Sequence, residues 1–385
     1  MGAGGGVDHN ATQYSDRPRI EELTFCRFIA ASMVVVAHVG SDVTGVGRFV
    51  GPSMMSFFFV LSGFVLGITY FNQRSDVKTY FVSRIGRIVP VYLLALFLMI
   101  AYLCLQGRTP ALSNMVLNVL MVHAWFLPNP ENINGPSWSL SVEAFFYLSF
   151  PLVMWLIKRH SVSTRTLFTL SFLLWVVTQI VVTQVMWNSE TAFLLGAEHD
   201  LVYYWPPIHL SSFLMGLAGA VWFLRTAEQR KQQPPASPLV ARLIVWSVVA
   251  LTVAVTVGQK SISAWLGVML PFGSSFMSPL FLLLIVTLSV YRMPFFDTKY
   301  AKPFIILGEA SYGIYILQAP AWYFWSTYVA EPLAIGATPG FYAFIVIFFG
   351  LSVFCYFGFE KPMNRYVRKK YSKRAEKVEV QAEAG

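Results

Sequence analysis

Long apolar runs constrain this chain more than any other feature of its sequence. Ten runs are long enough to cross the hydrocarbon core of a bilayer, which takes about 20 residues as a helix. Of the 385 residues, 56% are hydrophobic and 12% are charged, whereas about a quarter of the residues of a soluble domain are charged. We therefore predict an all-α, polytopic membrane protein with about ten transmembrane helices. The runs lie near residues 23–44, 49–71, 88–106, 137–157, 166–187, 207–224, 240–257, 273–291, 304–326 and 339–359.

An eleventh apolar run, 112–127, is shorter, and the distribution of basic residues decides how it is treated. Lys and Arg near the ends of spans stay in the cytoplasm. If this run does not cross, 24 of the 28 Lys and Arg residues lie on the cytoplasmic side. Only Arg48, Arg108 and Lys260 lie outside, and Arg27 lies in the first span. A crossing would invert part of the chain and remove that asymmetry. We therefore predict a re-entrant or interfacial segment on the outer side, with both termini cytoplasmic.

This topology divides the chain into three parts. Residues 1–22 form a cytoplasmic tail, residues 23–360 a membrane domain and residues 361–385 a basic cytoplasmic tail. The net charge of +9 is spread over short loops between apolar runs, where topology explains it, so no nucleic-acid partner is predicted. The three cysteines have no metal-ligand spacing, and no metal site is predicted.

The stretch RFIAASMVVVAH, residues 27–38, places two ionisable side chains on the first span. Eleven helical steps turn about 1,100° and rise about 16 Å, so Arg27 and His38 share one face of the helix. Arg27 could snorkel to the cytoplasmic headgroups, but His38 is too short to do so. His38 is then either a buried polar residue bonded to a neighbouring helix or part of a site.

The next three spans add packing and charge signals. Ser62, Gly63 and Gly67 lie in SFFFVLSGFVLG, where small residues allow helices to approach closely. Two arginines, in SRIGRIVPVY, stand one turn apart at a cytoplasmic span entrance and suit phosphate, although ordinary positive-inside charge also explains them. Glu143 in PSWSLSVEAFFY lies at a depth similar to that of His38, and such a pair could support general acid and base chemistry. The two arginines are Arg84 and Arg87.

Together these stretches resemble the acyltransferase 3 family, the multi-span acyltransferases that modify bacterial cell-surface glycans and some secondary metabolites. The resemblance covers about residues 20–366. It rests on six pieces in the right order, which are RFIAASMVVVAH, FFVLSGF, SRIGRIVPVY, PSWSLSVEAFFYLSFP, LGEASYGIYILQAP and EKP.

The resemblance implies roles for individual residues. His38 corresponds to the essential catalytic histidine and Arg27 to its required companion near the donor, while Glu143 supports the active site or the acceptor. Arg84 and Arg87 correspond to the cytoplasmic donor entrance. At the position of Gln318 the family commonly has a histidine, so a role that needs an ionisable group is not expected at this position. The further candidates for acceptor binding or support are Ser139, Tyr147 and Gln318.

The predicted function is that of an acetyl-coenzyme A-dependent O-acetyltransferase of the bacterial inner (cytoplasmic) membrane. The acceptor is a hydroxyl of a sugar in a cell-surface or lipid-linked glycan. His38 either removes the acceptor proton as general base or carries the acyl group covalently, and the sequence leaves both routes open. It also leaves open the acceptor, the acyl chain and the oligomeric state. The aromatic residues Tyr203, Tyr204 and Trp205 of an outer loop could stack on a sugar or anchor at the membrane interface.

Two other function classes are weighed against the acyltransferase. A proton-coupled secondary transporter also uses intramembrane His, Glu and Arg. Neither an internal repeat nor a matching pair of broken spans is detected in the two halves of the chain, which argues against transport. The other alternative is a non-catalytic flippase or assembly scaffold for surface polymers.

Overall fold

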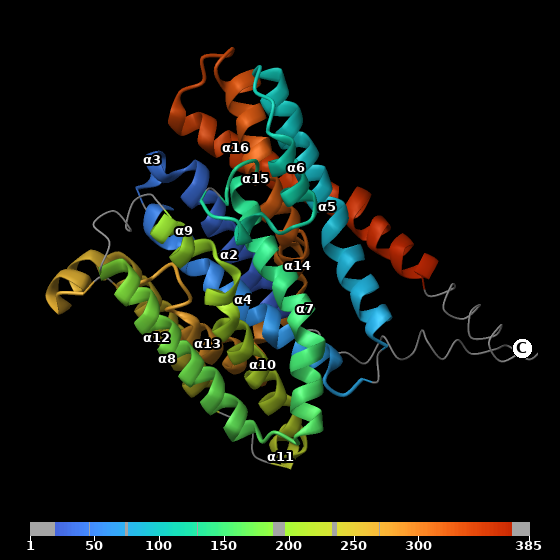
Figure 1. The fold of residues 1–385 in the computed structure, drawn as a ribbon, viewed down its shortest axis with the longest axis vertical. Coiled ribbons are helices and arrows are strands. Elements are labelled where there is room, and N and C mark those ends of the chain that lie inside the picture. Colours follow the sequence, from blue (N-terminus) through green and yellow to red (C-terminus); the bar gives the residue numbers. More distant parts are fainter. Residues whose placement is uncertain are drawn as a thin grey trace, which may run out of the picture.

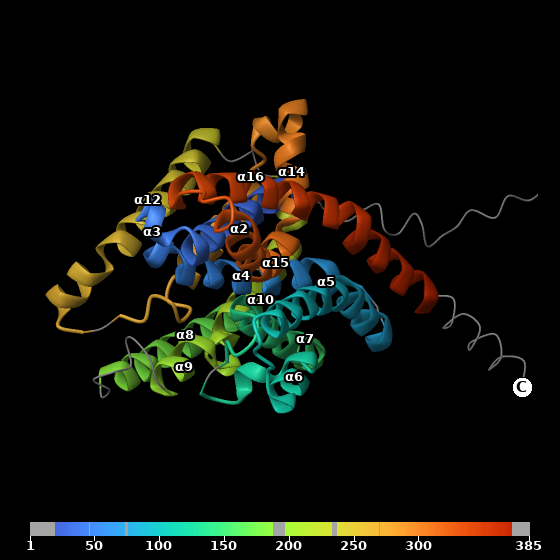
Figure 2. The same cartoon turned by 90° about the horizontal axis from the view of Figure 1, so that it is seen from above.

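The computed structural model describes residues 20–45, 47–73, 76–128, 130–187, 197–232, 237–268 and 270–371. In this part of the chain every regular element is a helix, and the helices form one bundle (Figures 1 and 2). Eight of the described helices are long and apolar enough to cross a membrane. The predicted all-α, polytopic membrane class is therefore confirmed.

The helices follow one another along the chain with short connections. The label η marks single turns of 3-10 or π helix. The elements are α2 (Glu21–Val39), α3 (Ser41–Thr44), α4 (Gly47–Tyr70), α5 (Val77–Leu105), α6 (Leu112–Val119), η1 (His123–Trp125), η2 (Gly135–Ser137), α7 (Trp138–Arg159), α8 (Thr164–Trp187), α9 (Ala197–Tyr204), η3 (Pro206–His209), α10 (Leu210–Arg225), α11 (Ala227–Gln232), α12 (Pro238–Leu266), α13 (Ser278–Val290), η4 (Pro294–Asp297), η5 (Lys299–Ala301), α14 (Lys302–Glu309), α15 (Ser311–Trp325), η6 (Ser326–Ala330), α16 (Ala337–Cys355) and η7 (Tyr356–Glu360).

Two of the ten predicted spans differ from single long helices. The run 304–326 is divided between α14 and α15, and the run 273–291 contributes only the 13 residues of α13. The chain just before α13 leaves the helical path because neighbouring side chains bond its backbone: Trp175 Nε1 donates to Ser275 O at 2.9 Å and Gln179 Nε2 to Ser274 O at 3.0 Å. Non-helical backbone is tolerated at membrane depth only where protein partners satisfy it. A hydropathy window cannot detect such partners.

The run 112–127 agrees with the prediction that it does not cross the membrane as a helix. Its helix α6 has eight residues and is about 12 Å long, far less than the roughly 30 Å of hydrocarbon. Buried Asn118 fixes the segment to its surroundings, because its backbone oxygen accepts a 2.6 Å hydrogen bond from Tyr92 and its side-chain amide donates to Asn132 at 2.8 Å.

Helices α4 and α10 make the closest helix pair near the middle of the bundle (Figures 1 and 2). A Cβ atom on Gly63 would lie 1.9 Å from the carbonyl oxygen of Phe213, and one on Gly216 would lie 1.9 Å from that of Val60. Both helices therefore need a hydrogen in place of a side chain where they cross. The prediction of close packing at Gly63 is confirmed, and its partner surface is α10.

The last helix extends beyond the predicted membrane domain. Helix α16 continues through the π-helical turn η7 and then as α-helix to Tyr371, one helix of 35 residues from Ala337. The predicted boundary at residue 361 therefore falls inside a continuous helix. Residues 1–19 and 372–385 of the two predicted tails lie outside the described residues.

Candidate active site

A cavity of about 680 Å³ lies inside the bundle. Helices α2, α4, α5, α7 and α15 form its walls. The remaining wall is the continuation of α16 over residues 356–371, which we call the C-terminal helix. A charged side chain within the hydrocarbon region of a membrane costs free energy and usually has a function. The charged lining therefore makes this cavity the candidate active site. The charged lining residues are Arg27, Arg84, Arg87, Glu143, Glu309, Glu360 and Arg368.

The cavity gathers six of the eight predicted site residues from three helices. Arg27 comes from α2, the predicted donor pair from α5, and three residues from α7. The lining includes neither His38 nor Gln318. The six lining residues are Arg27, Arg84, Arg87, Ser139, Glu143 and Tyr147.

Arg84 is the least exposed of the predicted donor residues. Its side chain is 7% exposed, and its Nη2 donates a 3.3 Å hydrogen bond to the hydroxyl of Tyr70. The guanidinium lies over the rings of Tyr70 and Tyr147, at 5.5 and 5.9 Å from their centroids. Its Nε is buried and has no hydrogen-bond partner among the described residues. A buried guanidinium with an unused N–H can still bind an anion that enters the cavity.

Glu143 is held by two hydroxyl groups inside the cavity. Its Oε1 accepts a 2.8 Å hydrogen bond from Tyr147, one turn later on α7, and a 3.4 Å bond from Ser62 on α4. The carboxylate also shares the cavity with the positive charge of Arg27. Within the described part of the chain its hydrogen bonds do not go to His38, so an acid–base pair of Glu143 and His38 stays a prediction.

His38 lies near the C-terminal end of α2, and the residue is partly accessible at the surface of the bundle. Its Nδ1 lies 2.9 Å from the backbone oxygen of Val34. A carbonyl oxygen only accepts, so we assign the proton of the neutral ring to Nδ1, which leaves the lone pair on Nε2. This tautomer suits a proton acceptor.

Gln318 connects His38 to the cavity. The side chain of Gln318 is fully buried and contacts the imidazole of His38. Its Nε2 donates a 2.7 Å hydrogen bond to the backbone oxygen of Tyr315, one turn earlier on α15, and Tyr315 lines the cavity. His38 is therefore separated from the cavity wall by one amide side chain.

Ser139 is committed to hydrogen bonds that join two helices. Its hydroxyl lies 2.7 Å from the hydroxyl of Tyr315 and 3.2 Å from the backbone oxygen of Pro136. The Tyr315 hydroxyl also donates to that same oxygen at 2.6 Å. This geometry favours support of the cavity wall over direct contact with an acceptor.

The sequence interpretation missed the cavity residues of the C-terminal helix. Glu360, Asn364 and Arg368 line the cavity beside the predicted donor arginines. The EKP motif marks Glu360, but in the sequence Arg368 looks like ordinary charge of a cytoplasmic tail. Only the helical continuation to Tyr371 brings Asn364 and Arg368 to the site.

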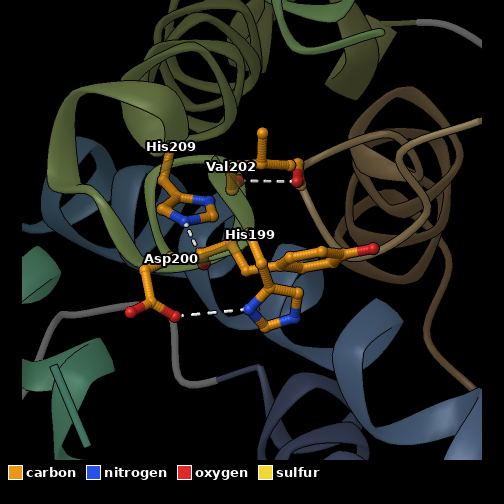
Figure 3. A network of polar contacts seen from close by, with 6 residues as sticks. His199, Asp200, Val202 and His209 are labelled. Atoms are coloured by element: carbon orange, nitrogen blue, oxygen red, sulfur yellow. Dashed lines mark hydrogen bonds and ion pairs between the residues drawn. The ribbon is translucent and has the colours of Figure 1, made fainter. Parts of the chain in front are cut away.

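The segment around Tyr203, Tyr204 and Trp205 is fixed by a polar network (Figure 3). Buried His209 contacts the backbone oxygen of Tyr203 through Nε2 and the hydroxyl of Ser275 through Nδ1, both at 3.0 Å. His199 pairs with Asp200 at 3.3 Å, and the Val202 backbone oxygen accepts a 2.7 Å bond from a serine hydroxyl (Figure 3). These contacts hold α9 in place, and sugar stacking by its aromatic residues stays a prediction.

Comparison with known proteins matches residues 20–357 to the family model described as an acyltransferase domain, the acyltransferase 3 model. The chain is 30% identical to Acyltransferase MdmB of Streptomyces mycarofaciens over 233 residues, which are 55% of this chain and 59% of that protein. It is 21% identical to the protein named "Putative O-acetyltransferase SACOL0978" of Staphylococcus aureus (strain COL), over 79% of this chain and 51% of that protein.

The chain thus spans about half to three fifths of the length of these relatives. No solved structure matches it. The family match covers nearly all of the described helices, including every wall of the cavity except the last turns of the C-terminal helix. The chain therefore belongs to the acyltransferase 3 family of membrane acyltransferases.

Proposed function

We propose that the protein is an O-acetyltransferase of the bacterial cytoplasmic membrane. It moves an acetyl group from cytoplasmic acetyl-coenzyme A to a hydroxyl of a sugar in a cell-surface or lipid-linked glycan. The observation that carries the proposal is the cavity. One end holds Arg84 and Arg87, and the other end reaches Tyr315. Gln318, one turn from Tyr315, contacts His38.

The donor enters from the cytoplasmic side in this proposal. Arg84, Arg87 and Arg27 bind its phosphates through charge-assisted hydrogen bonds. The pantetheine arm follows the cavity outward along α2, where the rise from Arg27 to His38 is about 16 Å. Glu143 and Tyr147 lie along this path and orient the arm or the acceptor.

The transfer itself uses the lone pair of His38 Nε2. The acceptor hydroxyl gives its proton to Nε2 while its oxygen attacks the thioester carbonyl. The new carbon–oxygen bond forms, the carbon–sulfur bond breaks, and the coenzyme A thiolate takes the proton from the imidazolium. The contact between Nδ1 and the Val34 oxygen keeps the ring in the required tautomer.

The test uses inside-out membrane vesicles that contain the protein, isotope-labelled acetyl-coenzyme A and an uncoupler. We expect the label to appear on a hydroxyl of a lumenal glycan in spite of the uncoupler, because the thioester supplies the free energy. In parallel vesicles without the uncoupler, proton-coupled accumulation of a solute with no transfer of the label would replace the proposal with the transporter.

Arg84→Gln is expected to raise the KM for acetyl-coenzyme A at least about tenfold, with kcat little changed. The loss of one charge-assisted hydrogen bond costs about 1.5–3 kcal/mol, and about 1.4 kcal/mol is a factor of ten. Initial rates over a range of donor concentrations give both constants. Lys78→Gln, an exposed residue at the start of the same helix, is the control. An unchanged KM in Arg84→Gln contradicts a donor role for Arg84.

The activity is expected to fall as the pH drops from 8 towards 5. Protonation of Nε2 removes the lone pair that accepts the acceptor proton, so the neutral form alone is active. Rates of the purified protein between pH 5 and 8, at saturating donor, measure the effect. A flat profile over this range contradicts a proton-accepting His38.

A further inference from the structure

The C-terminal helix presents four polar side chains to the cavity at a spacing of four residues. Tyr356, Glu360, Asn364 and Arg368 all line the cavity and belong to one continuous helix. Four helical steps turn about 400°, so residues at this spacing stay on one face. This polar stripe extends the cavity wall from the π-helical turn η7 to the cytoplasmic end of the helix.

A close contact with α5 brings the end of the stripe beside the predicted donor arginines. A Cβ atom on Gly86 would lie 3.0 Å from Val367 Cγ1 and 3.8 Å from the backbone oxygen of Asn364. Gly86 stands between Arg84 and Arg87 on α5, and Val367 stands beside Arg368. The two helices therefore hold three arginines around one end of the cavity.

Two residues of the stripe, Glu360 and Asn364, differ in the partners that surround them. The carboxylate of Glu360 lies near the charges of Arg87 and Arg27 and offsets them. The side-chain oxygen of Asn364 is buried and has no hydrogen-bond partner among the described residues. A buried acceptor without a partner is costly, so this oxygen is suited to accept a hydrogen bond from an N–H or O–H group of a molecule in the cavity.

We propose that Asn364 and Arg368 form the cytoplasmic half of the donor site and select a donor that carries a phosphorylated nucleotide. The inference rests on the proposed function, because it takes an acyl-coenzyme A as the donor. Arg368 binds phosphate together with Arg84 and Arg87, since a planar guanidinium forms forked hydrogen bonds to phosphate oxygens. Asn364 accepts a hydrogen bond from the same donor. A bare pantetheine thioester has no phosphate for Arg368 to bind.

The test compares two donors, acetyl-coenzyme A and acetyl-pantetheine, with the purified full-length protein. We expect Arg368→Gln to raise the KM for acetyl-coenzyme A about tenfold, from the loss of a charge-assisted hydrogen bond, with kcat unchanged. The KM for acetyl-pantetheine stays the same. Asn364→Ala raises the KM for acetyl-coenzyme A by a smaller factor. Arg365→Gln, an exposed arginine of the same helix, is the control and leaves both constants unchanged.

Direct binding of coenzyme A to the same variants separates this inference from the proposed function. Binding by the wild type that Arg368→Gln weakens, without any acetyl transfer, supports the nucleotide site and contradicts the proposed reaction. Equal binding by the wild type and Arg368→Gln contradicts the inference alone. An equal rise in KM for both donors also overturns it, because such a change reports damage to the cavity. Absence of binding by the wild type contradicts both.

Discussion

His38→Ala is expected to abolish the acetylation of glycans in cells that express the protein. Each O-acetyl group adds about 42 mass units to a glycan, and this increment is expected to disappear. Alanine offers no group that accepts the proton of the attacking hydroxyl, and a positioned general base contributes about 10²–10⁴-fold to the rate. If His38 carries the acyl group covalently, the variant loses the nucleophile instead. Mass spectrometry of surface and lipid-linked glycans from wild-type and variant cells measures the result.

Two controls make this comparison specific to His38. The membrane levels of the proteins are matched, and His160→Ala removes an exposed histidine that does not line the cavity. The increment is expected to persist in His160→Ala. If it also persists in His38→Ala, His38 takes no part in catalysis. If no increment appears with the wild type, the acceptor is not a glycan of that cell or the transporter reading must be reopened.

Gly63→Ala and Gly216→Ala are each expected to destabilise the folded bundle by about 2 kcal/mol or more. Each new Cβ would lie 1.9 Å from a backbone carbonyl oxygen of the opposite helix, so α4 and α10 must separate. Overpacking of a close-packed interior costs about 1–3 kcal/mol. Thermal unfolding of the purified proteins in detergent, followed by size-exclusion chromatography, measures the loss of folded protein.

The matched control is Gly350→Ala on α16, where an added Cβ meets no atom within 4 Å. Alanine has a higher helix propensity than glycine, so this variant is expected to be as stable as the wild type. The double variant of Gly63 and Gly216 is expected to lose less than the sum of the single losses, because one separation of the helices relieves both contacts. A Gly63→Ala protein with an unchanged Tm contradicts the packing argument.

The sequence predicts the features that depend on local composition. Apolar runs and basic loops predict the all-α membrane class, and the charge asymmetry separates the short run 112–127 from the spans. The small residue Gly63 predicted close packing, although not against which helix. The six cavity-lining candidates lie in motifs that carry the resemblance, and four of them are charged side chains that stand out in apolar runs.

The remaining features depend on contacts between distant segments. Glu143 is bonded to Ser62 of another helix, and no pattern along α7 encodes that partner. The loop before α13 leaves the helix because Trp175 and Gln179 bond its backbone. Arg368 looks like one of several tail charges until the helix carries it back to Gly86. Local composition does not report such tertiary contacts.

The amide of Gln318 beside His38 also changes how this site exchanges protons. An amide keeps the same charge throughout the physiological pH range, so the imidazole has a neighbour that cannot compete for its proton. Two histidines in contact would titrate as a coupled pair, with macroscopic constants that belong to neither ring. In this protein a nuclear magnetic resonance titration of His38 would follow one ionisation, and its midpoint could be assigned to a single residue.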